Sequence, residues 1–148
     1  MKIAIGADHA GYEYKPAIVG LLKQLGYDVF DYGTFSYDST DYPSYAFLVA
    51  SAVAKQEADY GILICGTGIG MSIAANKVKG IRAGAVQSTF AAKAIKEHNN
   101  ANVLCLGTRT NTLEEVLMFV HIYLDTPYSN GERHSKRIHM ISDFEEEQ

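Results

Sequence analysis

The sequence has little cysteine and no long hydrophobic run. Only two of its 148 residues are cysteines, Cys65 and Cys105, which argues against a secreted disulfide framework. Neither stands in a CxxC or Cys/His spacing, so we expect no metal site. No apolar run approaches the ~20 residues of a membrane span. The apolar start at Met1 stops at Asp8, too early for a signal peptide, and we therefore expect a cytoplasmic protein.

Basic residues are not in excess either. The 17 aspartates and glutamates outnumber the 13 lysines and arginines, for a formal net charge of −4 at pH 7. Nucleic acids and anionic membranes are bound through broad basic surfaces, and this balance argues against both as partners. A phosphorylated small molecule fits the balance, because a few local arginines suffice to bind one phosphate.

The chain contains no repeat, no low-complexity block and no linker rich in proline, glycine or serine. Hydrophobic residues make up 47% and charged residues 20%, which is the composition of a folded chain. A length of 148 residues fits one compact domain with a sizeable core. We therefore interpret residues 1–148 as a single domain.

Short apolar runs alternate with longer amphipathic stretches along the chain. We predict strands at 3–5, 28–31, 60–64, 81–86 and 103–106. Helices are predicted at 14–25, 43–55, 71–76, 88–98 and 112–124, with a C-terminal helix from 132 onward. This alternation predicts a Rossmann-like α/β fold: a three-layer αβα sandwich around a five-stranded parallel sheet. Ligands of such sheets bind beyond the carboxyl ends of the strands, so the loops there are the expected place for chemistry.

The strongest local signal is the loop from Cys65 to Gly70, which follows the third predicted strand. Its three glycines let backbone N–H groups turn toward one point, and the next helix adds the positive end of its dipole. With Thr67, this loop predicts an anion site for a phosphate or an enediolate oxygen. The alternative is a tight turn without a ligand. The spacing does not match the GxGxxG of dinucleotide-binding folds, and the loop Gly6–Gly11 lacks the Lys-Ser/Thr of a Walker loop.

Cys65 lies between a strand and a helix, a position that favours a reactive thiol. The alternative is an inert buried cysteine, which is our interpretation of Cys105 inside the fifth predicted strand. Asp8 and His9 directly follow the first predicted strand. We expect them to face Cys65, because the first and third strands of such sheets are commonly neighbours. His9 could then bind a phosphate and Asp8 a sugar hydroxyl, although such a pair is also common in turns.

Further candidates lie in the second half of the chain. Arg133 and Arg137 share one face of the C-terminal helix, where two guanidinium groups can clamp a phosphate. The alternative is a solvated basic face. Arg109 follows the fifth predicted strand and could join this clamp. His98 ends the fourth predicted helix, where a histidine is often only a favourable charge at a helix C-terminus.

Six motifs occur along the chain in this order: Gly6-Ala7-Asp8-His9-Ala10-Gly11, Thr40-Asp41-Tyr42-Pro43, Cys65-Gly66-Thr67-Gly68-Ile69-Gly70, Ala74-Ala75-Asn76-Lys77, Glu97-His98-Asn99 and Arg133-His134. From Lys2 to about Ile141, the chain resembles the B-type ribose-5-phosphate isomerases. The resemblance implies a cofactor-free aldose–ketose isomerase of the pentose phosphate pathway. It would interconvert ribose 5-phosphate and ribulose 5-phosphate through ring opening and an enediolate.

Two alternatives remain open beside this resemblance. Allose-6-phosphate isomerases and galactose-6-phosphate isomerase subunits share the scaffold, so the substrate could be a six-carbon 6-phosphate. The chain could also be a non-catalytic subunit that binds a phosphosugar. Such a subunit would be expected to have lost the base, the ring-opening residue or the arginines, and this sequence retains all of them.

The resemblance implies roles for individual residues. Cys65 matches the base that moves a proton between C2 and C1, a position that one branch of the family fills with glutamate. His98 matches the residue that opens the furanose ring. Thr67 and the amides of Gly66, Gly68, Ile69 and Gly70 match the anion hole for the enediolate. Substrate contacts are implied for sugar hydroxyls at Asp8 and Asn99, for the phosphate at His9, Arg109, Arg133 and Arg137, and in the sugar-site loop at Tyr42.

The predicted positions of two of these residues imply more than one chain per site. Cys65 is predicted at the carboxyl end of its strand, whereas His98 precedes the fifth strand and lies near the amino edge of the sheet. A five-residue strand is roughly 16–17 Å long, too far for both residues to act on one pentose. We therefore expect a homo-oligomer, a dimer or a tetramer, with active sites at the subunit interface. Its C-terminal helix, within residues 130–148, is expected to pack on a partner subunit.

Overall fold

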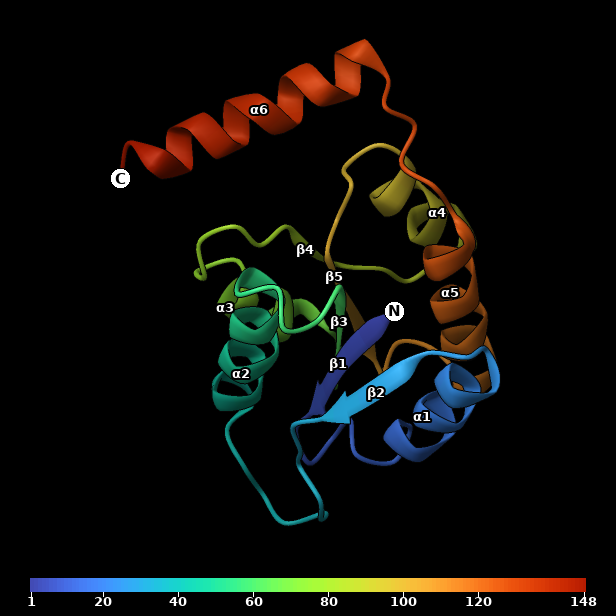
Figure 1. The fold of residues 1–148 in the computed structure, drawn as a ribbon. Helices are drawn as coiled ribbons and strands as arrows, with labels where there is room; N and C mark the ends of the chain where they lie inside the picture. Colours follow the sequence, from blue (N-terminus) through green and yellow to red (C-terminus); the bar gives the residue numbers. More distant parts are fainter.

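The structure of the protein, a computed structural model, describes residues 1–148 (Figure 1). Its strands are β1 (Lys2–Ala7), β2 (Asp28–Asp31), β3 (Tyr60–Cys65), β4 (Ala83–Ala85) and β5 (Val103–Gly107). Its helices are α1 (Lys15–Gln24), α2 (Tyr42–Ala54), α3 (Ile69–Ala75), α4 (Thr89–Glu97), α5 (Leu113–Asp125) and α6 (Glu132–Glu146). Every predicted strand and helix is present, with its ends close to the predicted ones.

The five strands form one parallel sheet in the order β2-β1-β3-β5-β4. β1 and β3 are neighbours, as predicted, and β5 lies on the other side of β3, where Gly107 pairs with Cys65. The carboxyl ends of the three central strands therefore meet at one edge of the sheet. Asp8, Cys65 and Arg109 stand at this edge because each ends or follows one of these strands.

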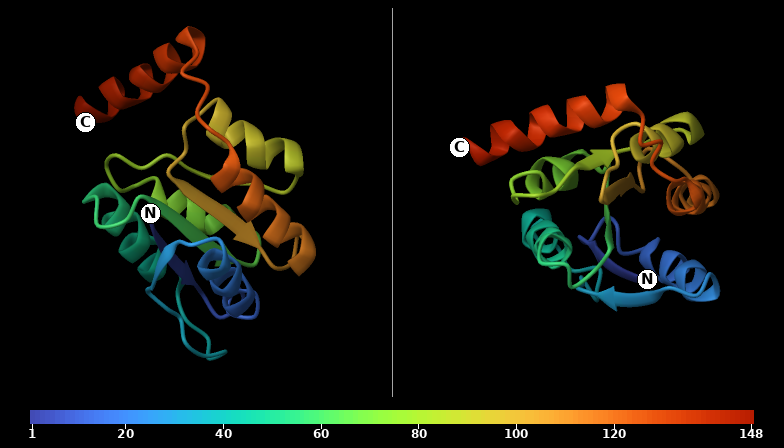
Figure 2. Two further views of the ribbon diagram at one scale, coloured as in Figure 1. Left: turned by 45° about the vertical axis from the view of Figure 1, so that its right-hand side comes forward. Right: turned by 45° about the horizontal axis from the view of Figure 1, so that its top comes forward.

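Helices cover both faces of the sheet, which confirms the three-layer αβα sandwich (Figures 1 and 2). α1, α4 and α5 pack on one face, and α2 and α3 pack on the other. Successive strand residues alternate between the two cores: Ile62 and Ile64 face the first, whereas Leu63 and Cys65 face the second. Because both faces are buried, the strands are apolar runs rather than alternating patterns.

β4 is shorter than the strand predicted at 81–86, which was too long at both ends. It is an edge strand, and the side chain of Asn76, just after α3, occupies its free side. Asn76 Oδ1 accepts the Ala83 N–H at 2.8 Å, and Asn76 Nδ2 donates to the Ala83 carbonyl at 2.9 Å. The N–H of Arg82 is taken by the side chain of Asn102 at 2.8 Å. Side-chain amides thus satisfy the backbone on the free side of β4 and just before its start.

The C-terminal helix α6 extends away from the rest of the fold (Figure 2). None of its residues is buried, and its apolar side chains Met140, Ile141 and Phe144 are more than half exposed. Its last turn reaches the loop before β4, where Lys79 Nζ lies 3.0 Å from Glu146 Oε2. Neither α6 nor any other helix is long and apolar enough to cross a membrane.

Candidate active site

Cys65 is the last residue of β3, and the glycine loop after it leads into α3. The chain turns at Gly68, whose φ of +79° is a left-handed conformation that favours glycine. A Cβ at this position would also lie 3.0 Å from the backbone N of Leu106. The turn places the Gly68 N–H 3.1 Å from Cys65 Sγ, so the sulfur accepts a hydrogen bond at the start of the helix.

The loop offers three N–H groups to an anion. Two others are used within the chain, because Gly68 N donates to Cys65 and Ile69 N donates to Thr67 Oγ1 at 3.2 Å. The amides of Gly66, Thr67 and Gly70 have no acceptor in the chain. Gly68 and Ile69 therefore hold the shape of the predicted anion site, whereas the other three amides can bind an anion directly.

Asp8 directly follows β1 and is 7% exposed. Its Oδ1 accepts the N–H groups of Ala10 at 3.0 Å and Gly11 at 2.9 Å, which closes the loop around the carboxylate. The Asp8 N–H donates to the carbonyl of Ile64 at 3.2 Å, and this bond holds the loop against β3 just before Cys65. The second carboxylate oxygen, Oδ2, is left to accept a hydrogen bond from a ligand.

His9 is oriented by the backbone of Thr40. The Thr40 N–H lies 3.1 Å from His9 Nδ1, and the Thr40 carbonyl oxygen lies 3.2 Å from the same nitrogen. Nδ1 accepts from the amide when the ring proton is on Nε2, and it donates to the carbonyl when Nδ1 itself is protonated. In the Nε2-protonated tautomer and in the charged ring, Nε2 can donate to an anion.

Arg109 and Tyr42 complete this edge of the sheet. The Arg109 N–H donates to the Gly66 carbonyl at 2.9 Å, and the arginine side chain lies over Gly66, where a Cβ would be 3.3 Å from Cδ and Nη1. Tyr42 is the first residue of α2, and its ring lies against Gly70, where a Cβ would be 2.7 Å from two ring atoms. The absence of side chains at both glycines thus lets Arg109 and Tyr42 approach the loop.

A cavity of about 250 Å³ opens between these loops at the carboxyl edge. Its lining consists of Asp8, His9, Ala10, Tyr42, Cys65, Gly66, Thr67, Gly70 and Arg109. All of these except Ala10 are residues that the sequence predicts for the site. A thiol, a carboxylate, a histidine, an arginine and three amides therefore surround one space.

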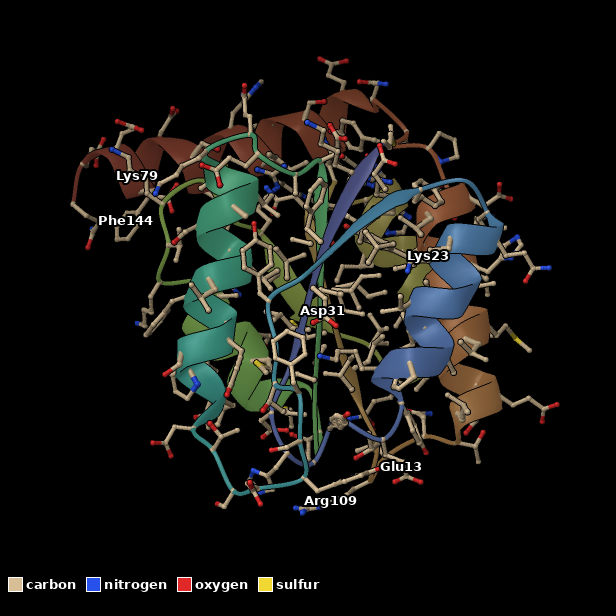
Figure 3. The ribbon with its side chains drawn as sticks, turned by 60° about the horizontal axis from the view of Figure 1, so that its bottom comes forward. Glu13, Lys23, Asp31, Lys79, Arg109 and Phe144 are labelled. Atoms are coloured by element: carbon tan, nitrogen blue, oxygen red, sulfur yellow. The ribbon has the colours of Figure 1, made fainter.

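Six other predicted residues do not line this cavity: Gly68 and Ile69, which shape its glycine loop, and His98, Asn99, Arg133 and Arg137, which lie elsewhere. His98 ends α4 and Asn99 follows it, ahead of β5, so both lie toward the amino edge of the sheet. Five residues of β3 pair with β5, and their span is about 13 Å. Figure 3 shows Arg109 at one end of the fold and Lys79, beside the last turn of α6, at the other.

A sequence model of the Ribose/Galactose Isomerase family matches residues 3–141. The chain belongs to this family. Ribose-5-phosphate isomerase B of Escherichia coli (strain K12) is 48% identical over 145 residues, which cover 98% of this chain and 97% of that protein. Ribose-5-phosphate isomerase B of Mycobacterium tuberculosis (strain ATCC 25618 / H37Rv) is 39% identical over 146 residues, with coverage of 98% and 90%.

Solved structures of the Ribose/Galactose Isomerase family match the fold over almost its whole length. Ribose-5-phosphate isomerase B of Clostridium thermocellum superposes with a TM-score of 0.97 at 46% identity and covers 99% of both chains. The Mycoplasma genitalium protein with bound ribulose-5-phosphate superposes with a TM-score of 0.96 at 44% identity, covering 99% of this chain and 97% of that one. The predicted fold and the predicted family are both confirmed.

In this family member, His98 lies in a cluster of its own. Its ring stacks on that of His134, with centroids 4.5 Å apart and planes at 30°, and its Nε2 lies 3.4 Å from a carboxylate oxygen of Glu97. His134 Nδ1 is 2.8 Å from the hydroxyl of Ser129. Desolvation and the neighbouring His98, Arg133 and Arg137 lower the pKa of His134.

The sequence did not reveal three residues that position the candidate site. Arg82 donates from Nε to the Asn99 carbonyl at 3.1 Å and from Nη2 to the Asn100 carbonyl at 2.8 Å, and so holds the segment after His98. Thr40 binds His9 through backbone atoms, which no side-chain pattern encodes. Thr40 and His134 both stand in motifs of the sequence, but the stacking of His134 on His98, 36 positions earlier, depends on the tertiary fold.

Proposed function

We propose that this chain is a ribose-5-phosphate isomerase, which interconverts ribose 5-phosphate and ribulose 5-phosphate. The observation that carries the proposal is the cavity at the carboxyl edge, where a thiol, three free amides, a histidine and an arginine surround one space. Relatives of that name match nearly the entire chain, and the Mycoplasma genitalium protein binds ribulose-5-phosphate.

In the proposed reaction, Cys65 acts as the base. The open-chain aldose becomes the ketose when one proton moves from C2 to C1 and the O2 hydroxyl proton moves to O1, with the electrons retained in the sugar. The Cys65 thiolate takes the C2 proton, which leaves an enediolate, and the resulting thiol protonates C1. The free amides of Gly66, Thr67 and Gly70 stabilise the negative charge on the enediolate, because their N–H dipoles are already oriented. The Thr67 hydroxyl can donate to the same oxygen.

The phosphate is the proposed handle for binding. His9 Nε2 and the Arg109 guanidinium supply two donors at the cavity, and Arg133 and Arg137 supply the clamp from α6. The Asp8 Oδ2 atom accepts from a sugar hydroxyl. The Asn99 side chain contacts a second hydroxyl, and Tyr42 lies beside the sugar. The phosphate lies remote from the reacting carbons, and its binding energy holds the sugar in place beside Cys65.

We further propose that each active site is shared between two copies of the chain. Cys65 and His98 lie at opposite edges of one sheet, and one pentose cannot span that distance. If His98 opens the sugar ring, it must reach the Cys65 cavity of a second copy, together with Asn99 and the α6 arginines. The exposed apolar side chains of α6 support this geometry, because the helix within residues 130–148 needs a surface on which to pack.

Subunit mixing tests the shared site. The variants Cys65→Ala and His98→Ala are expected to be nearly inactive alone. After they are unfolded together and reassembled, a mixed dimer carries both lesions in one site and none in the other. Random pairing makes about half of the dimers mixed, so activity should return to roughly a quarter of the wild-type value.

A matched mixture serves as the control. Cys65→Ala combined with Asp8→Ala places one lesion in each site, because both residues belong to the same cavity, and this mixture should stay inactive. Absence of recovery in the first mixture, with subunit exchange confirmed by mass, would exclude shared sites.

Turnover of ribose 5-phosphate and allose 6-phosphate, measured side by side, tests the substrate. A faster reaction with allose 6-phosphate would contradict the assignment.

A further inference from the structure

Lys15 is a charged residue in the interior that the proposed mechanism does not use. It is the first residue of α1 and is only 3% exposed. Lysine is almost never buried unless its charge is paired, because an ammonium group loses its hydration in the interior. The partners that compensate this charge therefore indicate what the residue holds together.

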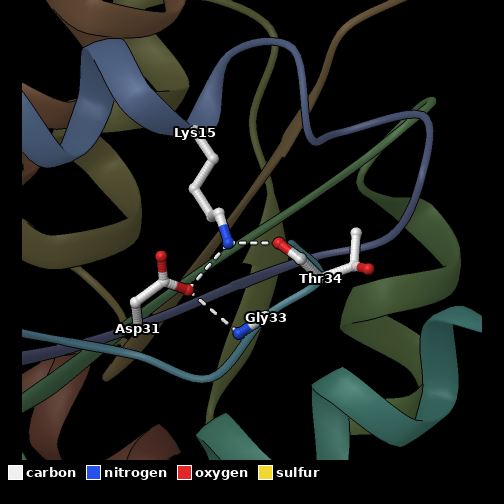
Figure 4. Close-up of polar contacts among 4 residues, drawn as sticks. All are labelled: Lys15, Asp31, Gly33 and Thr34. Carbon is white, nitrogen blue, oxygen red and sulfur yellow. Dashed lines mark hydrogen bonds and ion pairs between the residues drawn. The ribbon is translucent and has the colours of Figure 1, made fainter. Parts of the chain in front are cut away.

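The Lys15 ammonium group joins α1 to the chain that leaves β2 (Figure 4). Its Nζ lies 2.8 Å from Asp31 Oδ1 and also donates to the carbonyl oxygen of Thr34. The same Asp31 oxygen accepts the Gly33 N–H at 2.9 Å. Lys15 thus binds the start of the segment 33–41, which connects β2 to α2.

Aromatic rings link the same ammonium group to the segment 33–41: Phe35 directly, and Tyr37 through Tyr12. The Phe35 ring centroid is 4.4 Å from Lys15 Nζ, within the range of a cation–π contact, and the Tyr12 centroid is 5.5 Å away. Tyr12 in turn packs edge-on against Tyr37, with centroids 4.8 Å apart. Phe35 and Tyr37 are about 70% exposed, so these contacts rather than burial hold the middle of the segment.

The far end of the segment 33–41 reaches the cavity. Thr40 Oγ1 lies 2.9 Å from the hydroxyl of Tyr45, and the Thr40 backbone holds His9 Nδ1 through its N–H and its carbonyl. The hydrogen bonds from Thr34 and Thr40 also lower the pKa of Tyr45. The orientation of His9 therefore depends on a segment whose other end is held by Lys15.

We infer that Lys15 is a positioning residue for the substrate phosphate: it holds the segment 33–41 so that Thr40 aims His9 Nε2 into the cavity. This inference rests on the proposed function, in which His9 binds the phosphate. Loss of the Lys15 charge leaves Asp31 and the Thr34 carbonyl without this partner. The backbone bonds of Gly33 and Thr34 to Ala7 remain, but the segment loses the contacts that tie it to α1 and hold Phe35. His9 then donates to the phosphate with poorer geometry, which weakens binding but leaves proton transfer at Cys65 unchanged.

A double-mutant cycle distinguishes positioning through His9 from a general structural role. Lys15→Met removes the charge at similar length, and His9→Ala removes the phosphate contact. Each variant alone should raise KM for ribose 5-phosphate about tenfold, as expected for a weakened charged hydrogen bond, with kcat within about twofold of wild type. In the His9→Ala background, Lys15→Met should add less than about twofold to KM, because the residue it positions is gone.

Two further variants complete the experiment. Lys96 is the matched control, since it is also buried, at 4% exposure, and its Nζ lies 4.2 Å from the Tyr60 ring, but it does not touch the segment 33–41. Lys96→Met should change KM by the same factor in the wild-type and in the His9→Ala background. Asp31→Asn weakens the same ion pair at a partly exposed position, and it replaces Lys15→Met in the cycle if the latter does not fold.

The outcomes separate this inference from the assignment of His9. If His9→Ala leaves KM unchanged, His9 does not bind the phosphate, and both the assignment and the inference are wrong. If His9→Ala raises KM but the Lys15→Met effect is absent or multiplies with it, the inference alone is wrong. A KM effect of Lys15→Met that disappears without His9 supports positioning.

Discussion

Gly11 lies so close to the backbone of β3 that a methyl group added there should lower both stability and activity. A Cβ at Gly11 would lie 2.1 Å from the carbonyl oxygen of Ile64 and 2.5 Å from its carbon, both backbone atoms of the residue before Cys65. No side-chain rotation can relieve this overlap, so Gly11→Ala must displace the loop that carries Asp8 and His9. An ordinary contact begins at 3.4 Å, so the displacement is about 1.3 Å if the loop alone moves.

This displacement sets the expected magnitudes. Overpacking of a close contact costs about 3 kcal/mol or more when only backbone can yield. For a chain of this length, that corresponds to a fall in Tm of roughly 6–12 °C. A shift of about 1 Å between Asp8 and Cys65 is expected to lower kcat/KM on the order of a hundredfold, because the sugar can no longer meet both groups.

Thermal unfolding and initial rates with ribose 5-phosphate measure both effects. Gly20→Ala is the matched control, since Gly20 lies within α1 and a Cβ there has no neighbour within 4 Å. That variant should be more stable than wild type by about 0.5–1 kcal/mol, because alanine is the better helix former. A Gly11→Ala protein as stable and as active as wild type would refute the close approach of the two backbones.

The remaining predictions concern the base and the clamp. Iodoacetamide should alkylate Cys65 ahead of Cys105, and ribose 5-phosphate should protect Cys65, because this thiol lines the cavity. Cys105 is fully buried, and its burial and the nearby Cys65 raise the pKa of its thiol. Equal labelling of both thiols would contradict this prediction. Cys65→Ala should abolish turnover but retain phosphate-dependent binding, and turnover at the wild-type rate would exclude the thiolate as the base. Arg133→Ala or Arg137→Ala should raise KM roughly ten- to a hundredfold, with no effect on an unphosphorylated pentose. An unchanged KM in both would leave α6 as a solvated basic face.

Local sequence patterns suffice to predict the strands and helices of this fold. Strands buried on both faces are apolar runs, and amphipathic stretches between them are helices, so each element can be recognised without knowledge of its neighbours. Two helix starts show the same locality: Ser88 accepts the Ala91 N–H at 3.1 Å, and Thr112 forms a capping box with Glu115. The exception is β4, which is shorter than predicted and begins after Arg82, whose N–H donates to the side chain of Asn102.

The part of the candidate site at the carboxyl edge can also be predicted from the sequence, because parallel strands end at a common edge of the sheet. That rule brings Asp8, Cys65 and Arg109 together before any coordinates are known. It also places His98 at the opposite edge. The positioning contacts cannot be predicted this way: Lys15 begins an amphipathic helix, where a lysine is ordinarily solvated, and its burial depends on Asp31 and Thr34.

The sequence by itself determined the order of the elements, the glycine loop after Cys65 and the edge of the sheet at which that loop stands. These features depend on residues close together in the chain and on the geometry common to all parallel sheets. Only the tertiary structure decided which amides of the loop stay free, how His9 is oriented and what Lys15 holds. Those contacts join residues far apart in the chain, such as Thr40 and His9 across 31 positions, and they form only when the segments are packed together.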